Sequence, residues 1–72
     1  MDEKQLYIRL GRLIASERQK IKLSQERLSF LTGIDKTFIS RIERGKTNVK
    51  VKILNKSAKI FRAKISEFFT NQ

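Results

Sequence analysis

Apolar residues recur every three or four positions along most of this chain, which is the spacing of amphipathic helices. The segment 23–45 contains two such repeats, separated by a break at Gly33. The apolar positions are Leu28 and Leu31 in the first repeat and Phe38, Ile39 and Ile42 in the second. Glycine adopts the left-handed backbone conformation without steric cost, so Gly33 is expected to end the first helix. The pattern therefore predicts two short helices in direct succession.

Capping residues flank both of these predicted helices. Ser24 and Asp35 stand just before them and can accept hydrogen bonds from the free amide groups of a first helical turn. Gly45 follows the second helix and is suited to ending it. Two helices of about two turns each, joined by roughly three residues around a glycine, form a helix-turn-helix.

Amphipathic helices are also predicted on both sides of this motif. One covers residues 5 to about 20 after a polar, frayed start, and another covers about 51–61. Their apolar positions are Leu6, Leu10, Leu13, Ile14 and Ile21 in the first helix and Val51, Leu54, Ala58 and Phe61 in the other. Residues 62–65 are predicted to link this helix to a last short one at about 67–70, capped by Ser66. The prediction is an all-α fold, a compact bundle of five helices without a strand.

A glycine lies inside the first predicted helix. Gly11 costs that helix about 1 kcal/mol relative to alanine. Close approach of a neighbouring helix would explain the residue, and simple tolerance of the cost is the alternative.

The composition narrows the classes of function. The 72 residues carry a net charge of +10, which favours a polyanionic partner. The chain contains no cysteine and no histidine, so the commonest general base and the commonest metal ligands are missing. No apolar run approaches the ~20 residues that span a bilayer, and no signal-peptide pattern opens the chain. A cytoplasmic, non-enzymatic, anion-binding domain is expected, without a cofactor, a metal or a membrane partner.

The positive charge is concentrated in one part of the chain. Between Lys36 and Lys64 there are ten lysines and arginines against one acid, Glu43. This distribution favours a face that binds nucleic acid. A solvated basic surface that keeps the protein soluble is the alternative.

The string LSQERLSFLTGIDKTFISRIERGK resembles the helix-turn-helix family of phage repressors and Cro-type regulators. The resemblance lies in the Ser-Gln start of the first motif helix, the Thr-Gly turn, the Ile-Ser pair and the final Ile-Glu-Arg-Gly. It covers roughly residues 6–70 and implies a lambda-repressor-like five-helix domain that binds DNA. Near Lys50 the chain departs from the family, because it lacks a capping Ser or Thr and the proline often found in that loop.

Within this family, the run DKTFISRIERGKTN is most similar to controller proteins of restriction–modification systems. That similarity implies both repression and activation through tandem sites, with RNA polymerase as a further partner. A chain of 72 residues is long enough for one small domain, so residues 1–72 are expected to form a single DNA-binding domain. The helix-turn-helix would occupy about 24–45 and the dimerisation elements about 51–70.

The second motif helix is expected to enter the major groove of DNA. Its outward positions are Lys36, Thr37, Ser40 and Arg41, which we predict to read the bases. Arg41 and Lys36 can donate to the O6 and N7 atoms of guanine, and Thr37 can bond a base or touch a thymine methyl. The alternatives are an ordinary charged helix face and, for Lys36, a phosphate contact.

Contacts to the DNA backbone are predicted on either side of that helix. The residues are Gln25, Arg44, Lys46, Thr47 and Asn48. Gln25 matches the backbone-contacting glutamine of the family, and residues 46–48 match its phosphate-binding loop. Arg44 has an alternative role, because a cation in a last helical turn also stabilises the helix dipole. Further lysines could broaden the electrostatic footprint, namely Lys50, Lys52, Lys56, Lys59 and Lys64.

One predicted contact is structural. Arg18 and Glu43 match a family pair that joins the end of the first helix to the end of the recognition helix. Such a pair would fix the recognition helix to the rest of the domain. Two exposed and unrelated charges are the alternative.

We expect a sequence-specific regulator that binds a two-fold site in double-stranded DNA as a homodimer. The apolar residues Ile65, Phe68 and Phe69 lie close together near the C-terminus and are predicted to form the dimer interface. The alternative is that they close the bottom of a small core. A non-specific binder of RNA or of an anionic surface is the competing function.

Overall fold

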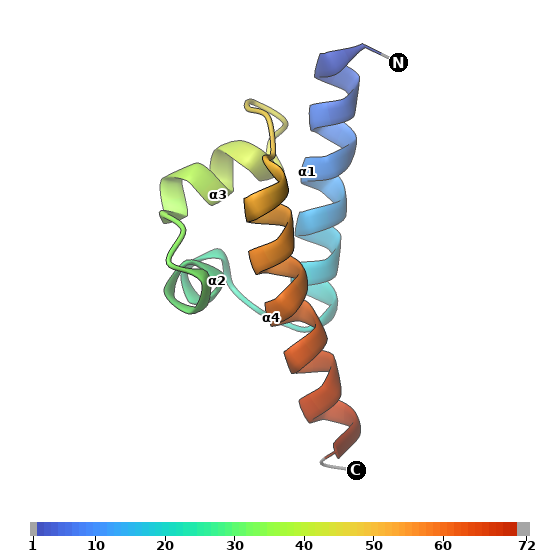
Figure 1. The fold of residues 1–72 in the computed structure, drawn as a ribbon, viewed down its shortest axis with the longest axis vertical. Helices are drawn as coiled ribbons and strands as arrows, with labels where there is room; N and C mark the ends of the chain where they lie inside the picture. The colour runs from blue at the N-terminus through green and yellow to red at the C-terminus, as the bar shows by residue number, and fades with distance from the viewer. Residues whose placement is uncertain (1, 71–72) are drawn as a thin grey trace.

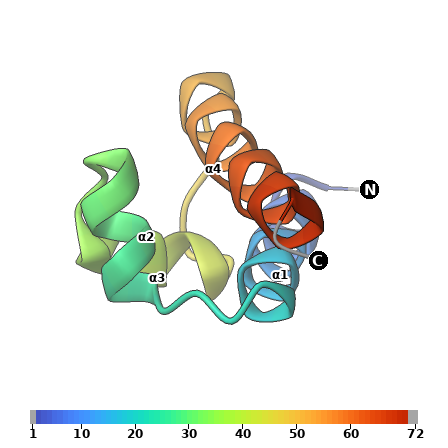
Figure 2. The ribbon, with the colours of Figure 1, turned by 90° about the horizontal axis from the view of Figure 1, so that it is seen from below.

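Residues 2–70 are described by the computed structural model, with side chains described as far as Lys64. Over this range the regular structure consists of four α-helices. They are α1 (Glu3–Lys20), α2 (Gln25–Thr32), α3 (Lys36–Glu43) and α4 (Val51–Thr70). Figure 1 shows the long helices α1 and α4 side by side, with the short helices α2 and α3 on one side of them. Figure 2, viewed along the long axis, shows the same arrangement, with α1 and α4 together and α2 and α3 on one side of them.

The prediction of five helices is wrong, because α4 is one continuous helix from Val51 to Thr70. Residues 62–65, which were expected to form a link, lie inside it, and so does Ser66. The segment Arg-Ala-Lys-Ile contains neither glycine nor proline, and its first three residues are good helix formers. Nothing in the sequence therefore ends the helix at this point. No helix in the described part of the chain is both long enough and apolar enough to cross a lipid bilayer.

Side-chain caps set the starts of the first three helices. The Asp2 carboxylate accepts a hydrogen bond of 2.8 Å from the Gln5 amide, so α1 begins at Glu3, and the predicted fraying of residues 3 and 4 is wrong. Ser24 caps α2 and Asp35 caps α3, as predicted. Gly33 follows α2 with a φ of +75°, which confirms its role in ending that helix.

The end of α3 depends on Gly45, whose φ is +72°. The Gly45 amide donates to the Ile42 carbonyl at 3.0 Å, and the Lys46 amide donates to the Arg41 carbonyl at 2.9 Å. These two bonds make a Schellman motif, which satisfies the last carbonyl groups of the helix. A Cβ atom on Gly45 would lie 2.7 Å from the side chain of Ile8, so the backbone also packs closely on α1.

The core lies between the four helices and contains at least one residue from each. Its buried apolar residues are Ile14, Leu23, Leu28, Ile34, Ile39, Ile42, Val49 and Phe61. Three positions predicted to face inward are exposed instead, namely Leu6 at 44%, Leu13 at 55% and Val51 at 71%. An 18-residue helix is about 27 Å long, whereas α3 spans about 12 Å, so α3 cannot cover the whole apolar side of α1.

An apolar groove of about 300 Å³ runs between α1 and α4. Leu13 and Ile14 line its α1 side, and Leu54, Ala58 and Phe61 line its α4 side. The exposure of Leu13 follows from its position on the edge of this groove. The described side chains thus leave an apolar surface open where the two long helices meet.

Gly11 lets α1 approach the end of α3, which confirms the explanation by close packing. A Cβ atom at this position would overlap the Ile42 carbonyl oxygen and lie 3.1 Å from the Glu43 carbonyl oxygen. Both neighbours are backbone atoms, so the steric overlap of an added Cβ atom could be removed only by moving one of the two helices.

We predict that Gly11→Ala lowers the free energy of unfolding by about 1–3 kcal/mol, because overpacking outweighs the gain in helix propensity. Urea unfolding followed by circular dichroism measures this change. Arg12→Ala, at the exposed neighbouring position, is the control and should change stability by less than about 0.5 kcal/mol. A Gly11→Ala protein as stable as the wild type would contradict the close approach of α1 and α3.

Candidate DNA-binding surface

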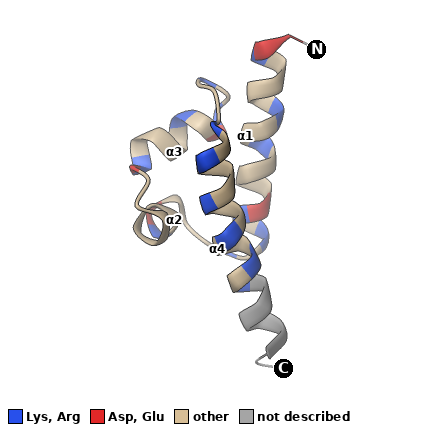
Figure 3. Ribbon diagram, viewed as in Figure 1, with Lys and Arg blue, Asp and Glu red and all other residues tan. Residues whose placement is uncertain are grey.

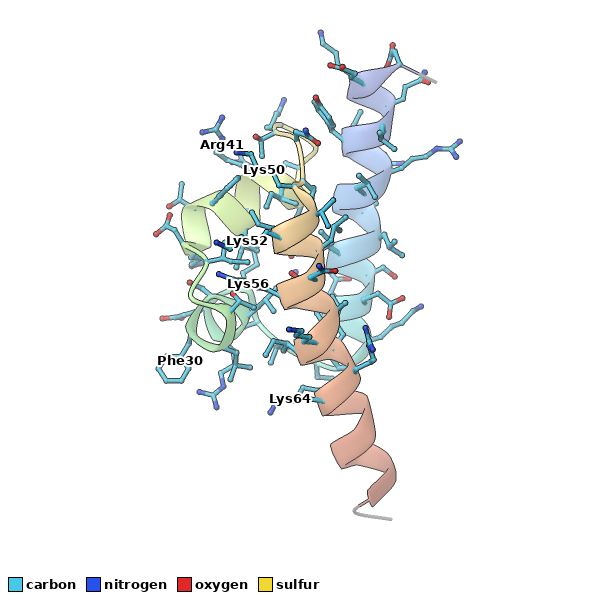
Figure 4. The ribbon with its side chains drawn as sticks, viewed as in Figure 1. Phe30, Arg41, Lys50, Lys52, Lys56 and Lys64 are labelled. Carbon is cyan, nitrogen blue, oxygen red and sulfur yellow. The ribbon has the colours of Figure 1, made fainter. Side chains whose placement is uncertain are left out.

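The outer side of α3 carries the residues predicted to read bases. Ile39 and Ile42 point into the core, so the helix has a defined outer face. On that face Lys36, Thr37 and Arg41 are exposed, and Ser40 is half-buried. Figure 4 shows the Arg41 side chain pointing away from the rest of the molecule. The structure therefore brings together the four predicted base-reading residues, with three of them exposed.

The predicted phosphate contacts after α3 lie in the loop that follows it. Lys46 and Asn48 are exposed, and Thr47 is half-buried. The exposed Arg44 donates from Nε to the Ser40 carbonyl at 3.2 Å, so its guanidinium group lies on the C-terminal turn of α3. This contact corresponds to the alternative role of Arg44, in which a cation satisfies the end of a helix.

Gln25, the first residue of α2, has a partner that the sequence did not indicate. Its Nε2 donates to Oε1 of Glu43 at 2.9 Å, and the residue is half-buried. The bond places the start of α2 beside the end of α3, next to the loop that begins at Arg44. A side-chain amide carries two hydrogens on nitrogen, so Gln25 keeps one donor for a phosphate oxygen.

Arg18 and Glu43 form the predicted ion pair. Arg18 Nε donates to Glu43 Oε2 at 2.8 Å, and Nη2 donates to Oε1 at 3.0 Å. The third donor, Nη1, bonds the Leu23 carbonyl at 2.7 Å. The two side chains are only 12% and 6% exposed. The hydrogen bonds to Glu43 raise the pKa of Arg18 above its ordinary value, although burial acts in the opposite direction.

This network determines the electrostatics of the surface as well as its geometry. Glu43 is the one acid between Lys36 and Lys64, and its charge is neutralised inside the domain by Arg18. Figure 3 shows lysine and arginine on α3, on the loop after it and along α4, whereas acidic residues lie mainly on α1, on α2 and before α3. Between Lys36 and Lys64 the exposed charged side chains are therefore all positive.

A second surface feature that the sequence reading missed lies on α2. Phe30 is 76% exposed, and the Arg27 guanidinium lies 5.1 Å from the centre of its ring. The two residues are three positions apart on one helix, a spacing that brings side chains together and could have indicated the pair. Phe30 lies away from the outer face of α3 in the view of Figure 4.

Two short capped helices, with the second one presenting an accessible polar face, define a helix-turn-helix domain. The chain belongs to the helix-turn-helix family, whose model matches residues 14–68. This membership confirms the predicted resemblance to phage repressors and Cro-type regulators at the level of the family.

Curated relatives agree with this membership. The chain is 35% identical over 60 residues to the HTH-type transcriptional regulator PuuR of Escherichia coli (strain K12) and of Shigella flexneri. The match covers 83% of this chain and 32% of PuuR, so the chain spans about a third of the length of these relatives. It is 36% identical over 52 residues to an uncharacterized HTH-type transcriptional regulator of Archaeoglobus fulgidus, covering 72% of this chain and 73% of that protein.

We predict that Glu43→Ala lowers the free energy of unfolding by about 2–4 kcal/mol, because it leaves the Arg18 guanidinium buried without its carboxylate. Urea unfolding measures the loss. Glu17→Ala is the matched control, since it breaks the exposed pair with Lys20 and should cost less than about 0.5 kcal/mol. Equal, small losses in both variants would show that the Arg18–Glu43 pair does not hold α3 in place.

Proposed function

We propose that this chain is a sequence-specific transcriptional regulator that acts in the cytoplasm and binds a two-fold DNA operator as a homodimer. The observation that carries the proposal is the accessible face of α3, which is held to the domain by the Arg18–Glu43 pair. The names of the curated relatives, which are HTH-type transcriptional regulators, support it.

Base reading is assigned to the outer face of α3. Arg41 donates two hydrogen bonds to the O6 and N7 atoms of a guanine, a geometry that a guanidinium group matches well. Lys36 and Thr37 lie one turn earlier, at the end of the helix that enters the groove first. Ser40 is half-buried, so it contributes at most a short contact to a base at the middle of the helix.

Backbone contacts are assigned to the two segments that meet at the end of α3. Gln25 donates its remaining amide hydrogen to a phosphate, next to the free backbone amides at the start of α2. Lys46, Thr47 and Asn48 bind the strand from the loop after α3. These contacts fix the position of the domain on the duplex but carry no sequence information.

A dimer is proposed because one recognition helix reads too few base pairs to select a site in a genome. The two-fold arrangement places the recognition helices about 34 Å apart, one turn of DNA. The interface is assigned to the C-terminal part of α4, where Ile65, Phe68 and Phe69 occur; their side chains lie outside the described residues. The open groove between α1 and α4 supports this assignment, because it leaves an apolar surface along α4 and the neighbouring α1 that a second copy of the chain would cover.

The regulatory output is proposed from the similarity to restriction–modification controllers. A controller represses and activates from tandem sites near its own promoter, with RNA polymerase as a partner. The competing function, non-specific binding of RNA or an anionic surface, is favoured by the net charge of +10 alone.

Selection of binding sites from a library of random duplex DNA tests the proposal directly. A regulator of this kind enriches one sequence with two-fold symmetry and half-sites about one helical turn apart. Unrelated duplex should then compete poorly for the bound protein. Enrichment of no sequence, together with full displacement by unrelated duplex, would favour the non-specific binder.

We predict that Arg41→Ala weakens binding to the selected site by about 1–3 kcal/mol, because a bidentate contact to guanine is lost. Binding to random duplex should change much less. Fluorescence anisotropy with both duplexes gives the two affinities. Arg12→Ala removes an exposed cation from α1 and should leave the preference between the duplexes unchanged. Equal losses on both duplexes after Arg41→Ala would identify Arg41 as a phosphate contact.

We predict that Phe69→Lys produces a folded monomer that binds the selected site far more weakly, because a charge at the interface prevents pairing. Sedimentation equilibrium at tens of micromolar measures the association state. Phe30→Lys makes the same exchange at the exposed position on α2 and should remain a dimer. A wild-type protein that sediments as a monomer would overturn the dimer.

A further inference from the structure

The side of α4 that faces away from the core carries a row of lysines. Lys52, Lys56 and Lys59, the α4 lysine row, lie four and three positions apart and therefore share one side of the helix. All three are exposed, whereas Ser57 and Phe61 on the other side of α4 are buried. Neither the core nor the groove between α1 and α4 uses these lysines.

The charges of the row are not compensated within the described part of the chain. No acid occurs on α4 between Val51 and Lys64. The ion pairs Arg18–Glu43 and Lys20–Glu17 both lie elsewhere and do not involve the row. Like charges at this spacing repel one another and destabilise a helix. A polyanion bound along the row would relieve that repulsion.

The row begins close to the proposed DNA contacts. Lys50 stands between the phosphate-binding loop at residues 46–48 and the first turn of α4. In the view of Figure 4, Lys52 and Lys56 project from α4 toward the side on which α2 and α3 lie, below Lys50 and Arg41. From Lys52 to Lys59 the helix rises about 10 Å, and each strand of duplex DNA carries one charge per ~3.4 Å of the helix axis. The row is therefore long enough to face several phosphates.

We propose that the α4 lysine row binds the phosphate backbone of the duplex that adjoins the half-site read by α3. The inference rests on the proposed function, since it takes the DNA position from α3 and the following loop. An ammonium group acts as a point charge and does not read sequence, so the row adds affinity without changing the preferred site. The DNA footprint then extends past the base pairs that α3 selects, and affinity depends on the length of the flanking duplex.

The test compares two triple variants of the full chain on two duplexes. One variant carries Lys52→Gln, Lys56→Gln and Lys59→Gln; the matched control carries Lys4→Gln, Arg9→Gln and Arg12→Gln on exposed positions of α1. Each removes three charges from the net +10. One duplex holds the selected site alone, and the other adds about one helical turn of unrelated sequence at each end. Affinities are measured from 50 to 200 mM salt, and circular dichroism checks that both variants are folded.

The wild type and the control variant should bind the flanked duplex at least about tenfold more tightly than the short one at low salt. The row variant should lose this gain, and the slope of log affinity against log salt on the flanked duplex should fall by about 5, because the proposed dimer carries two rows of three lysines and each phosphate contact contributes about 0.9. A Lys→Arg exchange at the same three positions should restore both quantities.

Three results would overturn the inference while leaving the proposed function intact. They are a flank-length gain that persists in the row variant, equal losses in the row and control variants, and, in a parallel titration with hairpin RNA, a row variant that loses affinity for the RNA alone. If no selected site exists for the wild type, the proposed function itself fails, and this outcome is separate from the other three.

Discussion

The fold depends on the ion pair between Arg18 and Glu43. Hydrophobic contacts of Ile39 and Ile42 hold α3 against the core, but such contacts are non-directional and do not fix the orientation of the helix. The two parallel hydrogen bonds between guanidinium and carboxylate do define it, because both groups are planar and their geometry is fixed. The third Arg18 donor binds the Leu23 carbonyl, and Gln25 binds Glu43 from α2. Four hydrogen bonds made by this one pair thus set the relative positions of three helices.

Glycine makes this arrangement possible. The middle of α1 approaches the end of α3 closely because Gly11 has no side chain to collide with the Ile42 carbonyl, one residue before Glu43. Arg18 lies about two turns further along α1 and reaches Glu43 from there. Gly45 then turns the chain away from α3 through a left-handed conformation and packs on Ile8 at the same time. A glycine inside a helix costs about 1 kcal/mol, and here the buried ion pair and its hydrogen bonds offset that cost.

The sequence predicted those features whose causes are local or involve chemically specific partners. Ser24, Asp35 and Gly33 act within one turn of their own position, so their roles as caps and terminators were correct. The burial of individual apolar residues depends on how far a neighbouring helix extends over them. The composition of the chain and the spacing of its apolar residues do not predict that extent. Leu13 and Val51 were therefore assigned to the core and are exposed.

The end of α4 and the partner of Gln25 show two further limits of the sequence. A link was predicted at residues 62–65, ahead of a helix capped by Ser66, but the residues present there favour a helix, and their own propensity decided the outcome. The bond from Gln25 to Glu43 joins residues far apart in the chain, and no spacing rule connects them. The predicted face of α3 is accessible as expected, whereas the base and phosphate roles of its residues remain predictions.

In the proposed function, the same ion pair lets a strongly basic protein select a DNA site. Positive charge alone attracts every nucleic acid and distinguishes none of them. Selection requires a few side chains at fixed positions relative to base edges, and flexible attachment of α3 would remove that precision. Glu43 is well suited to provide the attachment because it is a carboxylate buried against Arg18, so it anchors α3 without presenting a negative charge to the duplex. In the proposed function the domain thereby separates the two requirements: exposed lysines and arginines supply attraction, and a neutralised internal pair supplies the rigid frame from which Arg41 and its neighbours would meet the DNA.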